Sequence, residues 1–161
     1  MKEVLINKLH HYISENNPDV LVLLEEDGKL TDYLANKVNT VDVLINQVNE
    51  SQPAYIIEDA CMDVLTQNLK PSKYNYICNI LEVEFENYCQ QLKDSGTFKF
   101  EAVNLVNYCM PVFEDLVFNE ENEDNRFLRY AIIGCVSDYL QGNSENENVS
   151  DELQQSTKTE R

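Results

Sequence analysis

The chain has 161 residues, a length that suits one domain, and 43% of them are hydrophobic while 25% are charged, as in an ordinary globular protein. Its 29 acidic and 12 basic residues give a formal net charge of −17. Such a surface repels nucleic-acid phosphates and anionic lipid headgroups. We therefore expect a protein partner with a basic surface, and neither direct nucleic-acid binding nor membrane binding.

The fold class follows from turn residues and periodicity. Four glycines and four prolines are too few for the many tight turns of a β-sandwich, so an all-α fold is predicted. Apolar residues recur every three or four positions, which indicates helices. The predicted segments are 1–16, 17–28, 30–50, 53–65, 72–92, 98–118 and 125–140. The apolar run at 20–24 also resembles a buried strand, but no second strand segment exists to pair with it. We expect six or seven helices in a single, partly orthogonal bundle.

Several residues mark the expected ends and faces of these helices. Asn17 before Pro18 is a typical helix start, and Ser72 is a natural N-cap. Gly28 is suited to a left-handed position at a helix end. Phe127 is expected to face inward with the apolar stripe of the last helix, where Gly134 would permit a close helix crossing.

The end of the sequence differs in composition from the rest. From residue 141 onward almost no apolar side chain is present, so ordering this segment would not repay its conformational entropy. The predicted organisation is a helical domain over residues 1–140 and a disordered acidic tail over residues 141–161.

Cysteine usage and hydropathy predict a cytoplasmic location. No apolar run approaches the ~20 residues of a membrane span, and the N-terminal segment lacks a signal-peptide core. The five cysteines are odd in number and include no C-x-x-C pair. Helical phasing puts four on apolar stripes and the fifth at the edge of one, so buried, reduced, structural thiols are expected. These are Cys61, Cys78, Cys109 and Cys135, with Cys89 at the edge.

Catalytic and metal-binding signals are weak, and no enzyme activity, cofactor or metal is predicted. The two histidines, His10 and His11, are adjacent on one helix and so point about 100° apart. No metal-binding pair or nucleotide loop appears. A nucleophilic Cys–His pair is an alternative, although apolar surroundings would make a thiol inert. The acidic run at 120–124 lacks the register of a calcium loop and is better explained by the dipole of the following helix.

Like charges four residues apart are the first partner-binding signal. The pairs Asp59–Asp63 and Glu82–Glu86 each repel on a continuous helix. Either solubility or a cationic partner would compensate for that repulsion.

The second signal is the hinge at residues 71–74. Lys73 and Tyr74 follow Pro71 there, and hinges between rigid helices often carry recognition. The alternative is a packed corner with Tyr74 turned inward and Lys73 beside it. The candidate partner-binding residues are therefore Lys73, Tyr74, Asp59, Asp63, Glu82 and Glu86.

Three segments carry a resemblance: KLHHYISENNPDV at 8–20, DVLTQNLKPSKYNYICNILEVEF at 63–85, and AVNLVNYCMPVFEDL at 102–116. In these the sequence resembles a family of uncharacterised small helical proteins from gut bacteria, the domain-of-unknown-function family numbered eighteen-ninety-six. Asn17, Asn68, Pro71 and Asn75 depart from its pattern. The matching positions are Tyr12, Pro18, Asp19, Leu65, Leu69, Ser72, Lys73, Tyr74, Ile80, Leu81, Glu84, Phe85 and 111–113.

The resemblance spans roughly residues 4–140 and implies an all-α domain, typically encoded among the cargo of conjugative mobile elements, with no known activity. Together with the charge it favours a non-enzymatic acidic binding or accessory module. The alternative is a DNA-mimic inhibitor of a nucleic-acid enzyme linked to mobile elements. Residues 141–161 carry five acids and two bases, which leaves −14 for residues 1–140. This negative charge density is low in comparison with that of duplex DNA, which carries about one negative charge per 1.7 Å of its axis.

Overall fold

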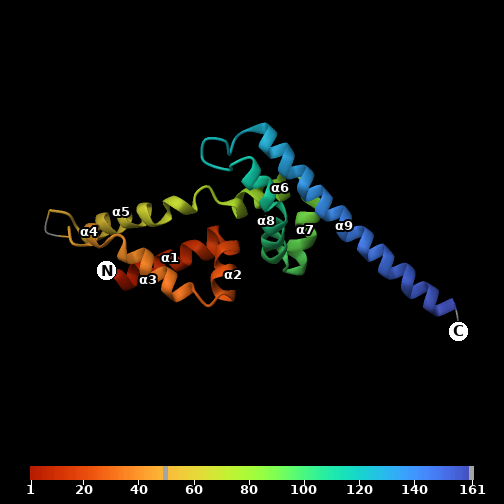
Figure 1. The fold of residues 1–161 in the computed structure, drawn as a ribbon, viewed down its shortest axis with the longest axis horizontal. Coiled ribbons are helices and arrows are strands. Elements are labelled where there is room, and N and C mark those ends of the chain that lie inside the picture. The colour runs from red at the N-terminus through yellow and green to blue at the C-terminus, as the bar shows by residue number, and fades with distance from the viewer. Residues whose placement is uncertain (49–50, 160–161) are drawn as a thin grey trace. The chain divides into compact units, whose positions relative to one another are not determined.

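A computed structural model describes the backbone of residues 1–48 and 51–159 and the side chains of residues 1–48 and 51–142. These residues form nine α-helices and one 3-10 helix, and no strand occurs among them, so the all-α prediction is confirmed (Figure 1). The helices are α1 (Lys2–Asn16), α2 (Pro18–Glu26), α3 (Leu30–Asn39), α4 (Asp42–Ile45), α5 (Ala54–Thr66), η1 (Gln67–Leu69), α6 (Lys73–Glu84), α7 (Glu86–Ser95), α8 (Phe98–Asp115) and α9 (Arg126–Thr159).

The number of helices exceeds the predicted six or seven because two expected helices are interrupted. The first break lies between α3 and α4, where the Thr40 hydroxyl donates to the Lys37 carbonyl at 2.6 Å. Such local bonds compete with the helical ladder. Val41, the residue after Thr40, is only 1% exposed. The break between α3 and α4 therefore accompanies the burial of the Val41 side chain.

The second break is at Phe85, which adopts φ −131° and ψ 50° between α6 and α7. A single helix over 72–92 is therefore wrong. The sequence predicted that Glu82 and Glu86 lie four residues apart on one helix. In the structure Glu82 lies on α6 and Glu86 on α7. The repulsion that a continuous helix would impose on them does not arise in that form.

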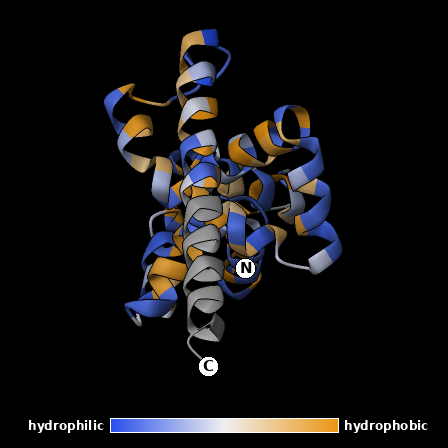
Figure 2. Ribbon diagram, turned by 90° about the vertical axis from the view of Figure 1, so that its right-hand side faces the viewer, coloured by the Kyte–Doolittle hydropathy of each residue, from blue (hydrophilic) through white to orange (hydrophobic). Residues whose placement is uncertain are grey.

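Two compact units make up the chain, residues 1–79 and residues 80–161. In the first unit α1 packs against α2, α3 and α5 (Figure 1). Apolar and polar residues alternate along the helices, as the hydropathy colours in Figure 2 show. The apolar faces form one core: Leu5, Leu9, Ile13, Leu34, Val38, Val41, Ile57, Cys61, Leu65 and Leu69.

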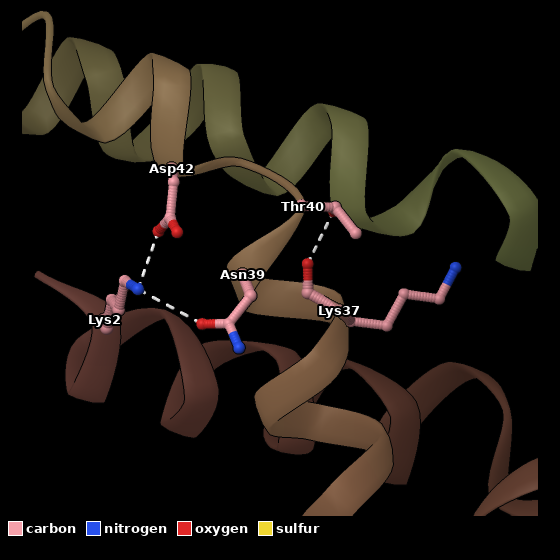
Figure 3. A network of polar contacts seen from close by, with 5 residues as sticks. All are labelled: Lys2, Lys37, Asn39, Thr40 and Asp42. Carbon is pink, nitrogen blue, oxygen red and sulfur yellow. Dashed lines mark hydrogen bonds and ion pairs between the residues drawn. The ribbon is translucent and has the colours of Figure 1, made fainter.

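A polar contact fastens the beginning of α1 to the α3–α4 break. Lys2 Nζ lies 2.7 Å from a carboxylate oxygen of Asp42 and donates to Asn39 Oδ1 at 3.1 Å (Figure 3). Both charged side chains are about half exposed, 50% and 46%. Exposed ion pairs contribute only ~0–1 kcal/mol, so the core beneath them, and not this contact, holds α1 in place.

In the second unit α8 packs against α7 and α9. Cys109, Phe113 and Ile132 are among its buried residues. Two expectations for α9 are wrong. Phe127 is 74% exposed, whereas the next residue, Leu128, is buried. Gly134 is exposed, and a Cβ placed there would meet nothing within 4 Å, so it permits no close crossing.

Three helices end in the same hydrogen-bond pattern. After α2, the Lys29 N–H donates to the Leu24 carbonyl. Gly28, the residue before Lys29, has φ +66°. After α7, Gly96 occupies the same position with φ +73°. Both are left-handed positions that glycine adopts without strain, as predicted for Gly28.

The α8 end repeats the pattern with valine in the glycine position. Phe118 N–H bonds to the Phe113 carbonyl at 3.0 Å, and Val117 has φ +51°. The rings of Phe113 and Phe118 lie 5.0 Å apart, the apolar contact that commonly accompanies this motif. A β-branched residue is strained in this conformation.

The backbone of α9 is helical to Thr159, whereas the sequence predicts disorder from residue 141. Extending an existing helix needs no new nucleus, and no proline interrupts residues 141–159. Residues 160 and 161 lie outside the described part. The domain boundary at residue 140 stays a prediction. Among the described residues no helix is long and apolar enough to cross a membrane.

Candidate functional site

The first unit contains an open hollow of about 530 Å³ along α1. Six of its lining residues step along nearly three turns of α1, and the seventh is Met62 of α5. The volume falls within the range of ligand-binding clefts. The α1 residues are Asn7, Lys8, His11, Tyr12, Glu15 and Asn16.

Charged residues surround the hollow unequally. Lys8 forms an ion pair with Glu58 of α5. That carboxylate raises the pKa of Lys8, and Asp59 nearby adds to the rise. Lys8 is therefore already neutralised within the protein. Glu15 also lines the hollow, so three acidic side chains, Glu15, Glu58 and Asp59, accompany one lysine here.

The hinge predicted from the sequence adjoins this hollow at Asn16. Ser72 Oγ accepts the Asn75 backbone N–H at 2.9 Å, which confirms Ser72 as the N-cap of α6. The same hydroxyl donates to the Asn16 carbonyl. Asn75 Nδ2 donates to Asn16 Oδ1 at 3.1 Å. The start of α6 is thereby tied to the end of α1.

Lys73 lies near a buried carboxylate. Asp19, at the start of α2, is 6% exposed, and one of its oxygens has no hydrogen-bond partner in the structure. Burial raises the pKa of Asp19, while its own backbone N–H and the positive charge of Lys73 oppose part of that rise. Lys73 is half-buried, and its positive charge stabilises the ionised form of Asp19.

Asn17 is used differently from the prediction. It occupies the N-cap position of α2, but its side chain makes no cap bond. Its Nδ2 instead donates to the Leu69 carbonyl at 3.1 Å. Asn17 thus joins α2 to η1. The N-terminus of α2 is stabilised instead by Pro18 in its first turn.

Tyr74 is half-buried, and Cys78 lies one turn later in α6. Burial is the main cause of its raised pKa, and Cys78 and Glu15 add to it. Glu15 also lines the hollow. Tyr74 therefore belongs to the packed corner of the hinge and at the same time borders the hollow.

The structure brings together only part of the predicted partner-binding set. Asp59 and Asp63 are both exposed on α5, and Asp59 lies near Lys8. Glu82 and Glu86 belong to the other unit. Glu82 Oε1 lies 3.6 Å from Lys93 Nζ, so Glu82 has a basic neighbour.

Reactive groups around the hollow are few. His11 lines it, whereas none of its seven lining residues is a cysteine. Both histidines are exposed. Cys61 is fully buried, and burial raises its thiol pKa. Within the described residues no group of three metal-ligating side chains is close enough to hold an ion.

Several residues of this site escaped the sequence analysis. Lys8, Tyr12 and Glu15 recur every three or four positions, which a helical projection reveals as one face of α1. The pairing of this face with Met62, 47 positions after Glu15, has no local signal in the sequence.

Comparison with protein-family models, with curated proteins and with solved structures gives no match. The resemblance to the helical family of gut bacteria therefore stays a prediction.

Proposed function

We propose that the chain is a non-enzymatic, cytoplasmic binding module, without a cofactor, that captures a basic amphipathic helix of a partner protein along the hollow of its first unit. The observation that supports this most strongly is the hollow itself, which is lined by Tyr12, Glu15 and Met62 and which has Asp59 near its lysine, Lys8. An amphipathic helix lays its apolar face into such a groove.

The dimensions and the charge of the hollow favour this partner. From Asn7 to Asn16 the α1 wall extends about 14 Å, or two to three turns of a docked helix. Lys8 is paired with Glu58, and lysines or arginines of the partner would face Glu15 and Asp59. Complementary charges of this kind favour fast association and correct orientation.

A defined probe tests the proposal. The full chain is titrated with a labelled peptide of leucine and lysine whose leucines lie on one helical face, at physiological ionic strength. We expect saturable binding, read by fluorescence anisotropy, and markedly weaker binding of a scrambled peptide of the same composition.

Matched variants locate the site. Glu15→Lys combined with Asp59→Lys should weaken binding at least about tenfold, a loss of ~1.4 kcal/mol. Glu26→Lys combined with Asp32→Lys changes the net charge equally at exposed positions away from the hollow lining. This control pair should leave binding within about twofold.

The alternative, a DNA mimic of a nucleic-acid enzyme linked to mobile elements, predicts a different pattern. A mimic binds through charge distributed along a face, so both double variants would weaken peptide binding alike. That outcome would reject the hollow as the binding site. Met62→Gln distinguishes the helix-binding module from the DNA mimic further, because this substitution weakens binding only if the peptide occupies the hollow.

A further inference from the structure

One of the two histidines belongs to the hollow and the other does not. His11 lines the hollow, whereas His10 is not among its seven lining residues. Both side chains are exposed. Adjacent residues of a helix point about 100° apart, so α1 places one imidazole in the hollow and the other outside it. The chain therefore provides its own control for an imidazole at this site.

Charged side chains lie next to His11 along α1. Lys8 is three positions before it and Glu15 four positions after it, and all three residues line the hollow. Residues at these spacings are neighbours on one face of a helix. A charge on the imidazole would therefore lie one helical turn from a lysine and one turn from a carboxylate.

A helix packed against α1 contributes further carboxylates. From α5, Glu58 forms an ion pair with Lys8, and the charge of Asp59 also raises the pKa of that lysine. The helices α2 and α3 pack against α1 as well, but within the described part of the chain neither supplies a residue of the hollow lining. Three carboxylates, those of Glu15, Glu58 and Asp59, therefore accompany one lysine in and beside the hollow.

The start of α6 leaves this balance of charge unchanged. Tyr74, near Glu15, is uncharged at neutral pH, and burial raises its pKa further. The charge of Lys73 acts on Asp19 of α2, and neither of these two residues lines the hollow. Carboxylates and lysines keep their charges between about pH 5 and 8, whereas histidine changes its charge there. Among the seven lining residues, His11 is therefore the group that titrates near neutral pH.

Protonation of His11 reduces the attraction between the hollow and a basic partner. With a neutral imidazole, three carboxylates and one lysine give a net charge of −2, and an imidazolium changes it to −1. The added charge also lies on the lining itself, where it repels lysines of a docked helix. The proton and the partner therefore oppose each other at this site.

We propose that His11 is a pH switch of the hollow, whose protonation weakens the binding of a basic amphipathic helix. This switch rests on the proposed function, since it regulates the same site. Because the partner favours the neutral imidazole, its binding must in turn favour release of the His11 proton. The affinity for the partner should therefore fall as the pH decreases through the range in which histidine titrates.

The labelled leucine–lysine peptide is the probe, because its lysines stay charged throughout this range. The full chain is titrated at about pH 8 and about pH 5.5, at equal ionic strength. We expect the affinity to fall about threefold at the lower pH, the size of one exposed charge interaction. His10→Gln should keep this dependence on pH, whereas His11→Gln should bind the peptide equally at both pH values.

Two further measurements separate the charge of His11 from its shape. His11→Lys carries a permanent positive charge, so at about pH 8 it should bind as weakly as the wild type does at about pH 5.5. Calorimetry at about pH 6.5, in two buffers of different ionisation enthalpy, should detect proton release when the peptide binds the wild type or His10→Gln. His11→Gln should release no proton.

Failure of the switch and failure of the proposed function give different results. Without saturable binding at either pH, the proposed function of the hollow is rejected and the switch with it. If the peptide binds the wild type equally at both pH values, or if His11→Gln keeps the wild-type dependence on pH, the switch is rejected while binding at the hollow stands.

Discussion

Asp19 shows how one buried carboxylate can link stability to pH. It lies in the first turn of α2, where a negative charge interacts favourably with the helix dipole, yet Asp19 is 6% exposed and one of its carboxylate oxygens lacks a partner. Burial raises the pKa of Asp19 in the folded chain above the unfolded value of about 3.9. The unfolded chain therefore loses this proton first as the pH increases, so ionisation of Asp19 lowers stability at neutral pH.

We expect Asp19→Asn to be more stable than the wild type at pH 7, because the amide carries no charge to desolvate. The advantage should shrink as the pH falls and vanish below about pH 4, where Asp19 is protonated in both states. Urea unfolding across this interval measures the difference. Asp63→Asn, at an exposed carboxylate, should show no comparable trend, and a pH-independent effect of Asp19→Asn would contradict the assignment.

Val117 carries backbone strain in a position where two other helix ends have glycine. Its side chain is 67% exposed, so removing it sacrifices little packing. A left-handed conformation costs an L-residue roughly 1–2 kcal/mol, part of which the flexibility of glycine offsets. We expect Val117→Gly to stabilise the chain by about 1 kcal/mol, measured by chemical denaturation.

Two glycines provide the matched controls for that variant. Gly96→Ala puts a Cβ at φ +73° and should destabilise by about 1 kcal/mol. Gly134→Ala is in an ordinary helical position with open space around it and should stabilise by up to about 1 kcal/mol. Destabilisation by Val117→Gly would show that the Val117 side chain contributes more than its strain costs.

At the scale of elements, periodicity predicted where helices lie because burying an apolar stripe requires a repeat of three to four residues. It could not predict the interruptions. Nothing local distinguishes Phe85 from the apolar residues around it, and Thr40 also occurs in uninterrupted helices. These breaks depend on the packing that each segment finds after folding.

The candidate site was predictable only in the parts that have a local signal. Ser72 was identified as a cap because capping residues act within one turn. Asp59 was identified from its spacing to Asp63. The hollow needs α1 beside α5, although the two helices are far apart in the sequence. Contacts between distant segments leave no periodic trace in one sequence.

At the scale of the whole molecule, α6 connects the two compact units. The division falls between residues 79 and 80, inside the helix Lys73–Glu84. Unfolding of either unit would remove the packing from one half of α6, and short helices without packing are marginal in water. The sequence predicts a single domain, and the shared helix gives a physical reason to expect cooperative unfolding.

Hydrogen exchange of the full chain measures this cooperativity. We expect Gly96→Ala, in the second unit, to increase exchange about fivefold, corresponding to ~1 kcal/mol, at the slowest amides of both units. Ile13 of α1 and Val106 of α8 are suitable reporters because both are fully buried. Gly134→Ala should slow exchange at the same two amides. If Ile13 kept its wild-type rate while Val106 changed in both variants, the units would unfold independently, and the chain would contain two domains.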